Sequence, residues 1–275
     1  MGFIYGLLSS AAFGLIPLFA LPLIHGGMPA PLVLFYRFSI AALVLGGILI
    51  LRGERFHTSA RSLCLLAGMS VMYAMAALLM FWGFAYMPSG VAATLQFLYP
   101  VMVMLLMIVF FHERFSWITA GAVALALLLV SALCNAIYIT AIFAARIPHM
   151  SGLVMTFYVL ALGGLLSLAN CLATGVFRPL RSWRELGLAL LLAVITAVIS
   201  NLTLILAVQR IGSTLASVLG VMEPLTAVLV GVCVFHEPFT PPIAGGVAFI
   251  VASVILVLLG DKVRALGARL HRRPQ

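Results

Sequence analysis

Long apolar runs separated by short polar breaks make up almost the whole chain. A membrane-spanning helix needs about 20 apolar residues. Runs of that length are expected as helices at residues 2–24, 30–51, 62–86, 90–111, 151–175, 185–208, 212–235 and 240–260. The breaks carry glycine, proline and arginine rather than further apolar residues. The pattern therefore predicts an all-α membrane protein.

One proline-containing stretch occurs twice. Residues 94–113 read TLQFLYPVMVMLLMIVFFHE, and residues 218–237 read VLGVMEPLTAVLVGVCVFHE. The shared features are a proline and a closing glutamate at the same spacing, namely Pro100 and Glu113 in the first copy and Pro224 and Glu237 in the second. Proline removes a backbone donor and kinks a helix, so kinks are expected at Pro17, Pro100 and Pro224. The recurrence predicts a duplicated chain with a proline-broken helix in each half.

Residues 115–146 fit neither one helix nor two. They are almost continuously apolar, and the repeat makes the expected fifth and sixth helices overlap by about ten residues if each is to span a membrane. We infer that a segment of about 20 residues, one span's worth, is absent near Val130 and Ser131. A chain break there would support this inference, and a continuous helix through residues 125–140 would contradict it. With that repair the prediction is ten transmembrane helices in two five-helix repeats, residues 1–130 and 131–260, followed by a basic tail at 261–275.

The distribution of basic residues predicts the orientation. With the N-terminus inside, eleven of the fifteen lysines and arginines fall in inner loops or the tail. The outer side then holds only Arg178, Arg181 and Arg184, while Arg37 lies inside a helix. Excess positive charge marks the cytoplasmic side, so both termini are expected there. Because each half has an odd number of helices, the halves are inverted relative to each other, an arrangement common in secondary transporters.

Composition excludes several classes of protein. The chain is 65% hydrophobic and 8% charged, against about 25% charged residues in a soluble domain. The net charge of +9 sits in breaks and the tail, which is the pattern of membrane topology rather than of nucleic-acid binding. The four cysteines lie in apolar runs with no CxxC and no nearby histidine at ligand spacing. We expect neither a cofactor nor a metal site.

Two charged residues inside the expected helices need a reason, because a charge at the bilayer centre costs at least about 2.5–3.5 kcal/mol. Glu223 precedes Pro224, and its counterpart in the first copy is Tyr99. It either binds a substrate amine or a proton, or stabilises the backbone at the proline. Arg37 binds a substrate carboxylate, pairs internally, or reaches towards an interface. Glu113 and Glu237 are expected to have structural roles at helix ends.

Uncharged polar and aromatic side chains complete the expected site. Interhelical bonding or core packing explains any one of them. Together they predict a wide cavity with an apolar wall and a few polar groups. The apolar wall is expected from Tyr73, Trp82, Phe97 and Tyr99, and the polar part from Gln96, Asn135, Tyr138 and Asn201. Substitution of Gln96 or Asn201 by alanine is expected to reduce transport.

The two stretches PSGVAATLQFLYPVMVMLLMIVFFHERF and IGSTLASVLGVMEPLTAVLVGVCVFHEPF resemble the repeated EamA domain of the drug/metabolite transporter superfamily. The run of small residues, the mid-helix proline and the closing glutamate carry the resemblance. Residues 35–38, Phe-Tyr-Arg-Phe, are similar to the aromatic-Arg-Phe signature of the second helix in such domains. The resemblance implies ten helices around a central cavity with inverted two-fold symmetry.

Within that superfamily the chain is similar to bacterial exporters of aromatic amino acids and paraquat. The resemblance implies a secondary transporter, not an enzyme, in the bacterial inner membrane. It implies alternating access, a small-molecule substrate and lipid as partners, and a monomer, with a dimer as the alternative. Other hypotheses are a sugar-phosphate or nucleotide-sugar exchanger, which needs more buried cations than Arg37, and a cationic drug exporter. An intramembrane enzyme is the remote alternative, since it needs clustered catalytic groups.

Overall fold

The computed structural model of the protein describes residues 1–54, 58–86, 126–145, 150–220 and 222–239, together with single positions at 92, 96, 244, 245 and 248. The chain divides into two compact units, Met1–Glu237 and Pro238–Gln275. Nearly all described residues belong to the first unit, and the following description concerns that unit alone.

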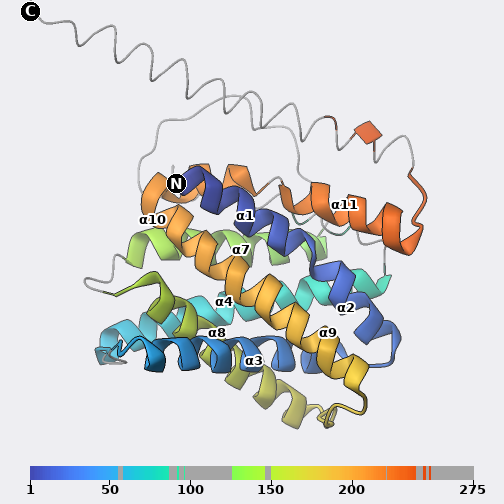
Figure 1. Ribbon diagram of the computed structural model, residues 1–275, viewed down its shortest axis with the longest axis horizontal. Helices are drawn as coiled ribbons and strands as arrows, with labels where there is room; N and C mark the ends of the chain where they lie inside the picture. Colours follow the sequence, from blue (N-terminus) through green and yellow to red (C-terminus); the bar gives the residue numbers. More distant parts are fainter. Residues whose placement is uncertain are drawn as a thin grey trace, which may run out of the picture. The chain divides into compact units, whose positions relative to one another are not determined.

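Every secondary-structure element in the described part of the first unit is a helix (Figure 1). In chain order these are α1 (Gly2–Gly14), α2 (Ile16–His25), α3 (Ala30–Leu51), α4 (Ala60–Tyr86), α7 (Ala126–Ala145), α8 (Gly152–Ala173), α9 (Trp183–Ala193), the π-helix η2 (Val194–Ile199), α10 (Ser200–Leu219) and α11 (Met222–Phe235). The predicted all-helical class is therefore observed throughout this part of the chain.

Five helical segments are long and apolar enough to cross a membrane. They are Gly2–His25, Ala30–Leu51, Ala60–Phe84, Gly152–Ala173 and Trp183–Leu219. Two shorter apolar helices, Leu133–Ala144 and Met222–Phe235, accompany them. The expected helices at residues 90–111 and 240–260 lie outside the described residues except for single positions, and residues 115–125 also lie outside them. The count of ten helices stays a prediction.

Two of the three prolines at which kinks were predicted, Pro17 and Pro224, lie in the first turn of a helix, whereas Pro22 lies inside α2. α1 ends at Gly14, and Pro17 lies in the first turn of α2. Pro224 likewise lies in the first turn of α11, after a turn at Gly220. The first residues of a helix have no intrahelical acceptor for their N–H groups, so proline costs little there. Pro100 lies outside the described residues.

The segment Trp183–Leu219 contains more than one helix. Gly212 has φ 83° and ψ 166°, so the regular helix stops there, at the boundary predicted between residues 185–208 and 212–235. Only glycine adopts such a φ without strain. Within the same segment η2 inserts a π-helical stretch into an otherwise α-helical span, and such insertions occur frequently at functional sites.

The predicted chain break near Val130 and Ser131 is wrong, because α7 runs without interruption from Ala126 to Ala145. This is the outcome that contradicts a missing segment at that point. The physical reason lies in its sequence, ALLLVSALCNAIYITAIFAA, which contains no glycine or proline to end a helix.

α3 and α8 pack against each other in opposite directions. Near the start of α3 the Tyr36 hydroxyl donates to the Arg178 carbonyl oxygen beyond the end of α8 (2.7 Å). Beyond the end of α3, Glu54 accepts from the hydroxyl of Ser151, which precedes α8 (2.7 Å). Gly164 allows the close approach, since a Cβ there would lie 2.9 Å from the Ser39 hydroxyl. An antiparallel pair is what an inverted repeat requires of its two second helices.

α1 lies along α10 and reaches α11 (Figure 1). The Ser9 hydroxyl donates to the Ser200 carbonyl oxygen on α10 (2.8 Å). At Gly14 an added Cβ would lie 2.5 Å from the Glu223 carbonyl oxygen and would also collide with Thr226. Small residues thus let α1 approach the helix that carries Glu223, as expected for helix packing in membranes.

Candidate functional site

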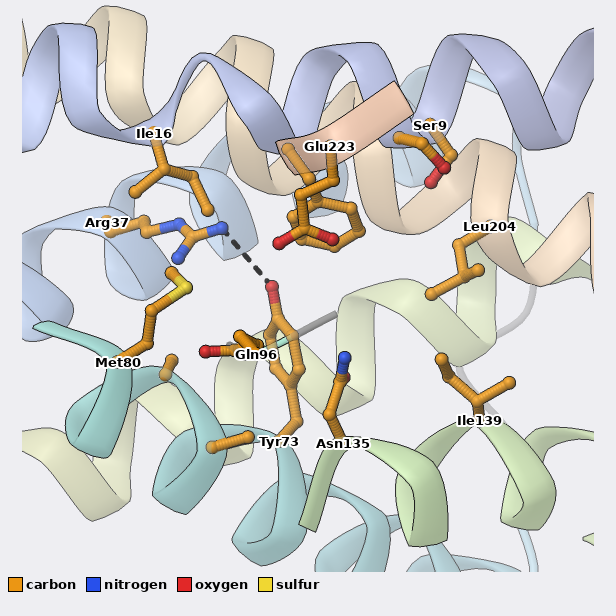
Figure 2. A pocket seen from close by; sticks show the side chains of 14 residues that line it. Ser9, Ile16, Arg37, Tyr73, Met80, Gln96, Asn135, Ile139, Leu204 and Glu223 are labelled. Carbon is orange, nitrogen blue, oxygen red and sulfur yellow. Dashed lines mark hydrogen bonds between the residues drawn. The ribbon is translucent and has the colours of Figure 1, made fainter. Parts of the chain in front are cut away.

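A narrow cavity lies between α1, α2, α3, α4, α7, α10 and α11 (Figure 2). Its volume is about 30 Å³, far below the roughly 300–1,000 Å³ of a pocket that encloses a drug-sized ligand. It is lined by Ser9, Ser10, Phe13, Ile16, Arg37, Tyr73, Ala76, Ala77, Met80, Gln96, Asn135, Ile139, Leu204 and Glu223. The predicted cavity therefore exists, but it is much narrower than the wide cavity expected from the sequence.

Arg37 is held inside the protein and does not reach towards a membrane interface. The side chain is 1% exposed. Its Nη2 donates to the carbonyl oxygen of Thr196 in η2 (2.7 Å) and to the hydroxyl oxygen of Tyr73 (3.3 Å). Its Cζ also lies 5.6 Å from the centre of the Phe38 ring. Aromatic contact of this kind stabilises a cation that has been removed from water.

Glu223 supplies a carboxyl group to the same cavity. Its side chain is 7% exposed and lies in the first turn of α11. The partial positive charge at a helix N-terminus favours a carboxylate there. Among the described residues the only ion pair joins Arg178 and Glu185. Arg37 and Glu223 thus face one cavity, and their nitrogen and oxygen atoms are separated by more than the 4.0 Å of an ion pair.

A second group of polar side chains lies behind Tyr73. Asn201 donates from Nδ2 to the Tyr73 hydroxyl oxygen (2.7 Å) and to the Ala197 carbonyl oxygen (3.0 Å). The Tyr138 hydroxyl donates to Asn201 Oδ1 (3.2 Å). Asn201 and Tyr138 are fully buried, and neither lines the cavity. The sequence predicted both as cavity residues, and the structure places them one layer further from it.

Trp82 does not contribute to the cavity wall. It is 47% exposed, whereas Tyr73, on the same helix, is 4% exposed and lines the cavity. The two are nine residues apart, which at 3.6 residues per turn places them on opposite sides of α4. The structure therefore does not bring Trp82 to the lining of this cavity, where Met80 lies on the same side of α4 as Tyr73.

The other predicted residues divide into four groups. Gln96 and Asn135 line the cavity, as expected. Glu237 lies beyond the end of α11, where its backbone N–H donates to the Gly231 carbonyl oxygen (3.0 Å), and it is not a cavity residue. Phe97, Tyr99, Pro100 and Glu113 lie outside the described residues, so their roles stay predictions. Pro224 lies beside Glu223 at the start of α11.

Sequence reasoning missed the contribution of the first helix. Ser9 and Phe13 on α1 line the cavity, and their spacing of four residues places them on one helix face, while Ile16 lines it from the start of α2. Ala76, Ala77 and Met80 follow Tyr73 with the same periodicity on α4. This periodicity was readable, but the run is apolar on every face, so nothing singled out the cavity side. Among the described residues no three histidine, cysteine, aspartate or glutamate side chains gather as a metal site.

Comparison with known proteins is consistent with this architecture. The EamA-like transporter family matches the chain twice, at residues 1–129 and 122–259. The two matches share residues 122–129, the stretch in which the sequence predicted two overlapping helices. No curated protein sequence matches the chain.

The fold is also found in a solved structure, described only as "Crystal structure of protein". It has a TM-score of 0.72 at 17% sequence identity, over 95% of this chain and 98% of that one. At that identity the likeness concerns the fold alone. Two family matches that together cover residues 1–259, five apolar helices long enough to span a membrane and a buried charged cavity lead to one conclusion: the chain belongs to the EamA-like transporter family, as a multi-pass membrane transporter of drug/metabolite type.

Proposed function

We propose that the protein exports small zwitterionic metabolites, aromatic amino acids first among them, by alternating access through the cavity between Arg37 and Glu223. The observation that carries this proposal is the pair of opposite buried charges that face one cavity without forming an ion pair. A free amino acid carries one carboxylate and one ammonium group. It therefore complements both charges at once.

The energetic argument concerns the cost of burying charge. Removing a carboxylate or guanidinium group from water costs several kcal/mol per ion, and a close ion pair would offset part of that cost. Arg37 has two neutral acceptors, and Glu223 has the N-terminus of α11. A ligand that brings its own opposite charges would stabilise both groups further. This gain in binding free energy favours a zwitterion over a singly charged or neutral ligand.

The remaining lining suits an apolar ligand body. Carbon surfaces come from five helices around the cavity, namely Phe13 on α1, Ile16 on α2, Met80 on α4, Ile139 on α7 and Leu204 on α10. Because the volume is about 30 Å³, the helices must separate before an amino acid is enclosed. Separation of one helical group from another around a central site is the movement that alternating access requires.

The same proposal keeps the repeat organisation expected from the sequence. It assigns residues 1–130 and 131–260 to two inverted repeats, with the boundary between them inside α7, and residues 261–275 to a basic tail. It also places the protein in the bacterial inner membrane with both termini in the cytoplasm. The functional unit in this proposal is a monomer. The antiparallel packing of α3 and α8 supports the inverted relation.

Transport by purified protein in proteoliposomes tests the proposed function. We expect counterflow of labelled L-phenylalanine in vesicles preloaded with unlabelled L-phenylalanine, above that of protein-free vesicles. The same vesicles should transport glucose 6-phosphate poorly, because Arg37 is the only described cation that the cavity offers to a doubly charged phosphate. They should also transport methyl viologen poorly, because it has no carboxylate for Arg37. Imposing a pH gradient shows whether protons accompany the substrate.

Other results would assign a different substrate. Counterflow of glucose 6-phosphate alone would support the sugar-phosphate exchanger, and counterflow of methyl viologen alone would support the cationic drug exporter. Either result would contradict export of amino acids. Transport of none of the three, by protein that elutes as one symmetric peak on size exclusion, would also contradict it.

A further inference from the structure

The Tyr73 hydroxyl is fixed as a hydrogen-bond acceptor by its two protein partners. Arg37 Nη2 lies 3.3 Å from the Tyr73 oxygen, and Asn201 Nδ2 lies 2.7 Å from it. A guanidinium group and the nitrogen of an amide can only donate. The Tyr73 oxygen therefore accepts both bonds, and its own hydrogen is left to donate elsewhere.

The orientation of the Asn201 amide follows from its other neighbours. One amide atom lies 3.0 Å from the Ala197 carbonyl oxygen, which can only accept, so that atom must be Nδ2. The opposite atom then is Oδ1, and it accepts from the Tyr138 hydroxyl at 3.2 Å. The surrounding groups thus determine which end of the amide meets Tyr73, and they leave Asn201 no flipped alternative of equal energy.

A second donor belongs to the same cavity. The Nε–H group of Arg37 is buried and has no hydrogen-bond acceptor in the described part of the chain. In both of its described hydrogen bonds the Tyr73 hydroxyl oxygen is the acceptor, and the Glu223 carboxyl group lines the same cavity. Arg37 and Tyr73 both line it as well (Figure 2). Leaving a buried donor unpaired costs about 1–3 kcal/mol. An anion that accepts from Arg37 Nε–H and from the Tyr73 hydroxyl would remove this cost and would also be attracted by the guanidinium charge.

We propose that Tyr73 and Arg37 form a carboxylate-binding subsite, and that Asn201 and Tyr138 are positioning residues that keep the Tyr73 hydroxyl hydrogen available to it. The subsite takes a carboxylate whose two oxygens accept from the Tyr73 hydroxyl and from the Arg37 guanidinium. This inference rests on the proposed function, because it names the groups that bind one end of the transported zwitterion. It also assigns Asn201 and Tyr138 a role other than substrate contact.

The π-helix η2 contributes to the same arrangement. It presents the Thr196 carbonyl oxygen to Arg37 (2.7 Å), while Asn201, five residues later, reaches Tyr73. In a regular α-helix, residues five apart are rotated by about 140° from each other. A π-helical stretch, with its wider turn, brings such residues closer to one face. One helical segment can therefore hold Arg37 directly and Tyr73 through Asn201.

Equilibrium binding of three probes to purified protein in detergent tests the subsite. The probes are L-phenylalanine, phenylalaninamide, which lacks the carboxylate, and 3-phenylpropionate, which lacks the amine. In Tyr73→Phe we expect about a tenfold or greater loss of affinity for both carboxylates, since a hydrogen bond to a charged group is lost. The affinity for phenylalaninamide should change by less than about twofold, because this probe has no carboxylate to accept a charge-assisted hydrogen bond from the Tyr73 hydroxyl.

Asn201→Asp is the variant that tests positioning. An aspartate of the same shape accepts the Tyr73 hydroxyl hydrogen and turns it away from the cavity. The affinity of this variant for the two carboxylate probes should therefore also fall by about tenfold. Tyr138→Phe should lose less, about two- to fivefold, because the Asn201 amide keeps its other two partners. Thr140→Val is the matched control on α7, since its buried hydroxyl has no partner in the described structure.

The outcomes separate the subsite from the proposed function. If the ratio of the affinities for L-phenylalanine and phenylalaninamide were the same in Tyr73→Phe as in the wild-type protein, the inference would be overturned. This result would hold even if Asn201→Asp failed to fold. Wild-type protein that binds neither carboxylate probe would overturn it as well. Binding of 3-phenylpropionate but not of L-phenylalanine, with the loss expected in Tyr73→Phe, would support the subsite and contradict export of amino acids.

Discussion

Replacing Arg37 by glutamine should abolish L-phenylalanine counterflow and also lower the free energy of unfolding by about 1.5–3 kcal/mol for each hydrogen bond lost from the guanidinium group. The substitution removes the bonds to Thr196 and Tyr73 together with the only described cation of the cavity. Glu223 then faces that cavity without a compensating charge. Both effects have one cause, so they should appear together in thermal melting and in transport.

Two further variants separate charge balance from recognition. The double variant Arg37→Gln, Glu223→Gln removes both charges and should recover part of the lost stability, while transport stays absent. Arg37→Lys keeps the charge but lacks the planar fork that reaches both acceptors, so partial stability with weak transport is expected. Full counterflow by Arg37→Gln, or a double variant no more stable than the single one, would show that the two charges do not act together.

Replacing Gly14 by valine should have the second largest effect. A Cβ at this position would lie 2.5 Å from the Glu223 carbonyl oxygen and would collide with Thr226, so α1 and α11 must move apart. Overpacking of this kind costs about 1–3 kcal/mol. The displacement also moves the helix that carries Glu223. We therefore expect a lower melting temperature in detergent. We also expect at least a tenfold loss of counterflow, since a loss of about 1.4 kcal/mol in substrate-binding free energy lowers the affinity tenfold.

Gly47→Ala provides the matched control for Gly14→Val. An added Cβ at Gly47 has no atom within 4 Å, and the residue lies on the exposed side of α3. Alanine has the higher helix propensity, so melting temperature and counterflow should be unchanged or slightly higher. If Gly14→Val resembled Gly47→Ala in both measurements, the close packing of α1 on α11 would not be what positions Glu223.

Helix positions were predictable from the sequence because each span is a nearly uninterrupted apolar run. The predicted helix at residues 30–51 is α3, Ala30–Leu51, and the predicted helix at 151–175 is α8, Gly152–Ala173. The breaks inside runs were less accessible. Pro17 and Pro224 were recognised as disruptive, but an apolar run does not show whether a proline kinks one helix or begins another. The preceding Gly14 and Gly220 were the available signals.

The side of each helix that faces the cavity could not be predicted. In a soluble protein the polar face of a helix points to water, so the buried face is the opposite, apolar one. A membrane helix is apolar both towards lipid and towards its neighbours, so this contrast is missing. Trp82 and Tyr73 therefore looked equivalent, although only Tyr73 lines the cavity. Charges and amides were better guides: Arg37, Gln96, Asn135 and Glu223 were all singled out from the sequence, and all line it.

The layer of Asn201 and Tyr138 was also inaccessible from the sequence. Whether a polar side chain lines a cavity or supports another that does depends on distances between helices far apart in the chain. Asn201 and Tyr73 are separated by 128 residues, and no local pattern records their contact. The π-helix η2 has no sequence signature in VITAVI that distinguishes it from the α-helix on either side.

The central claim is that one ligand must present a carboxylate to Arg37 and an ammonium group to Glu223. Competition against labelled L-phenylalanine counterflow in proteoliposomes measures this most directly, with unlabelled L-phenylalanine, 3-phenylpropionate and 2-phenylethylamine as competitors. We predict that L-phenylalanine inhibits at least about tenfold more strongly than either singly charged analogue, as expected when each buried charge contributes about 1.4 kcal/mol or more. Equal inhibition by L-phenylalanine and either analogue would contradict recognition of a zwitterion between the two buried charges.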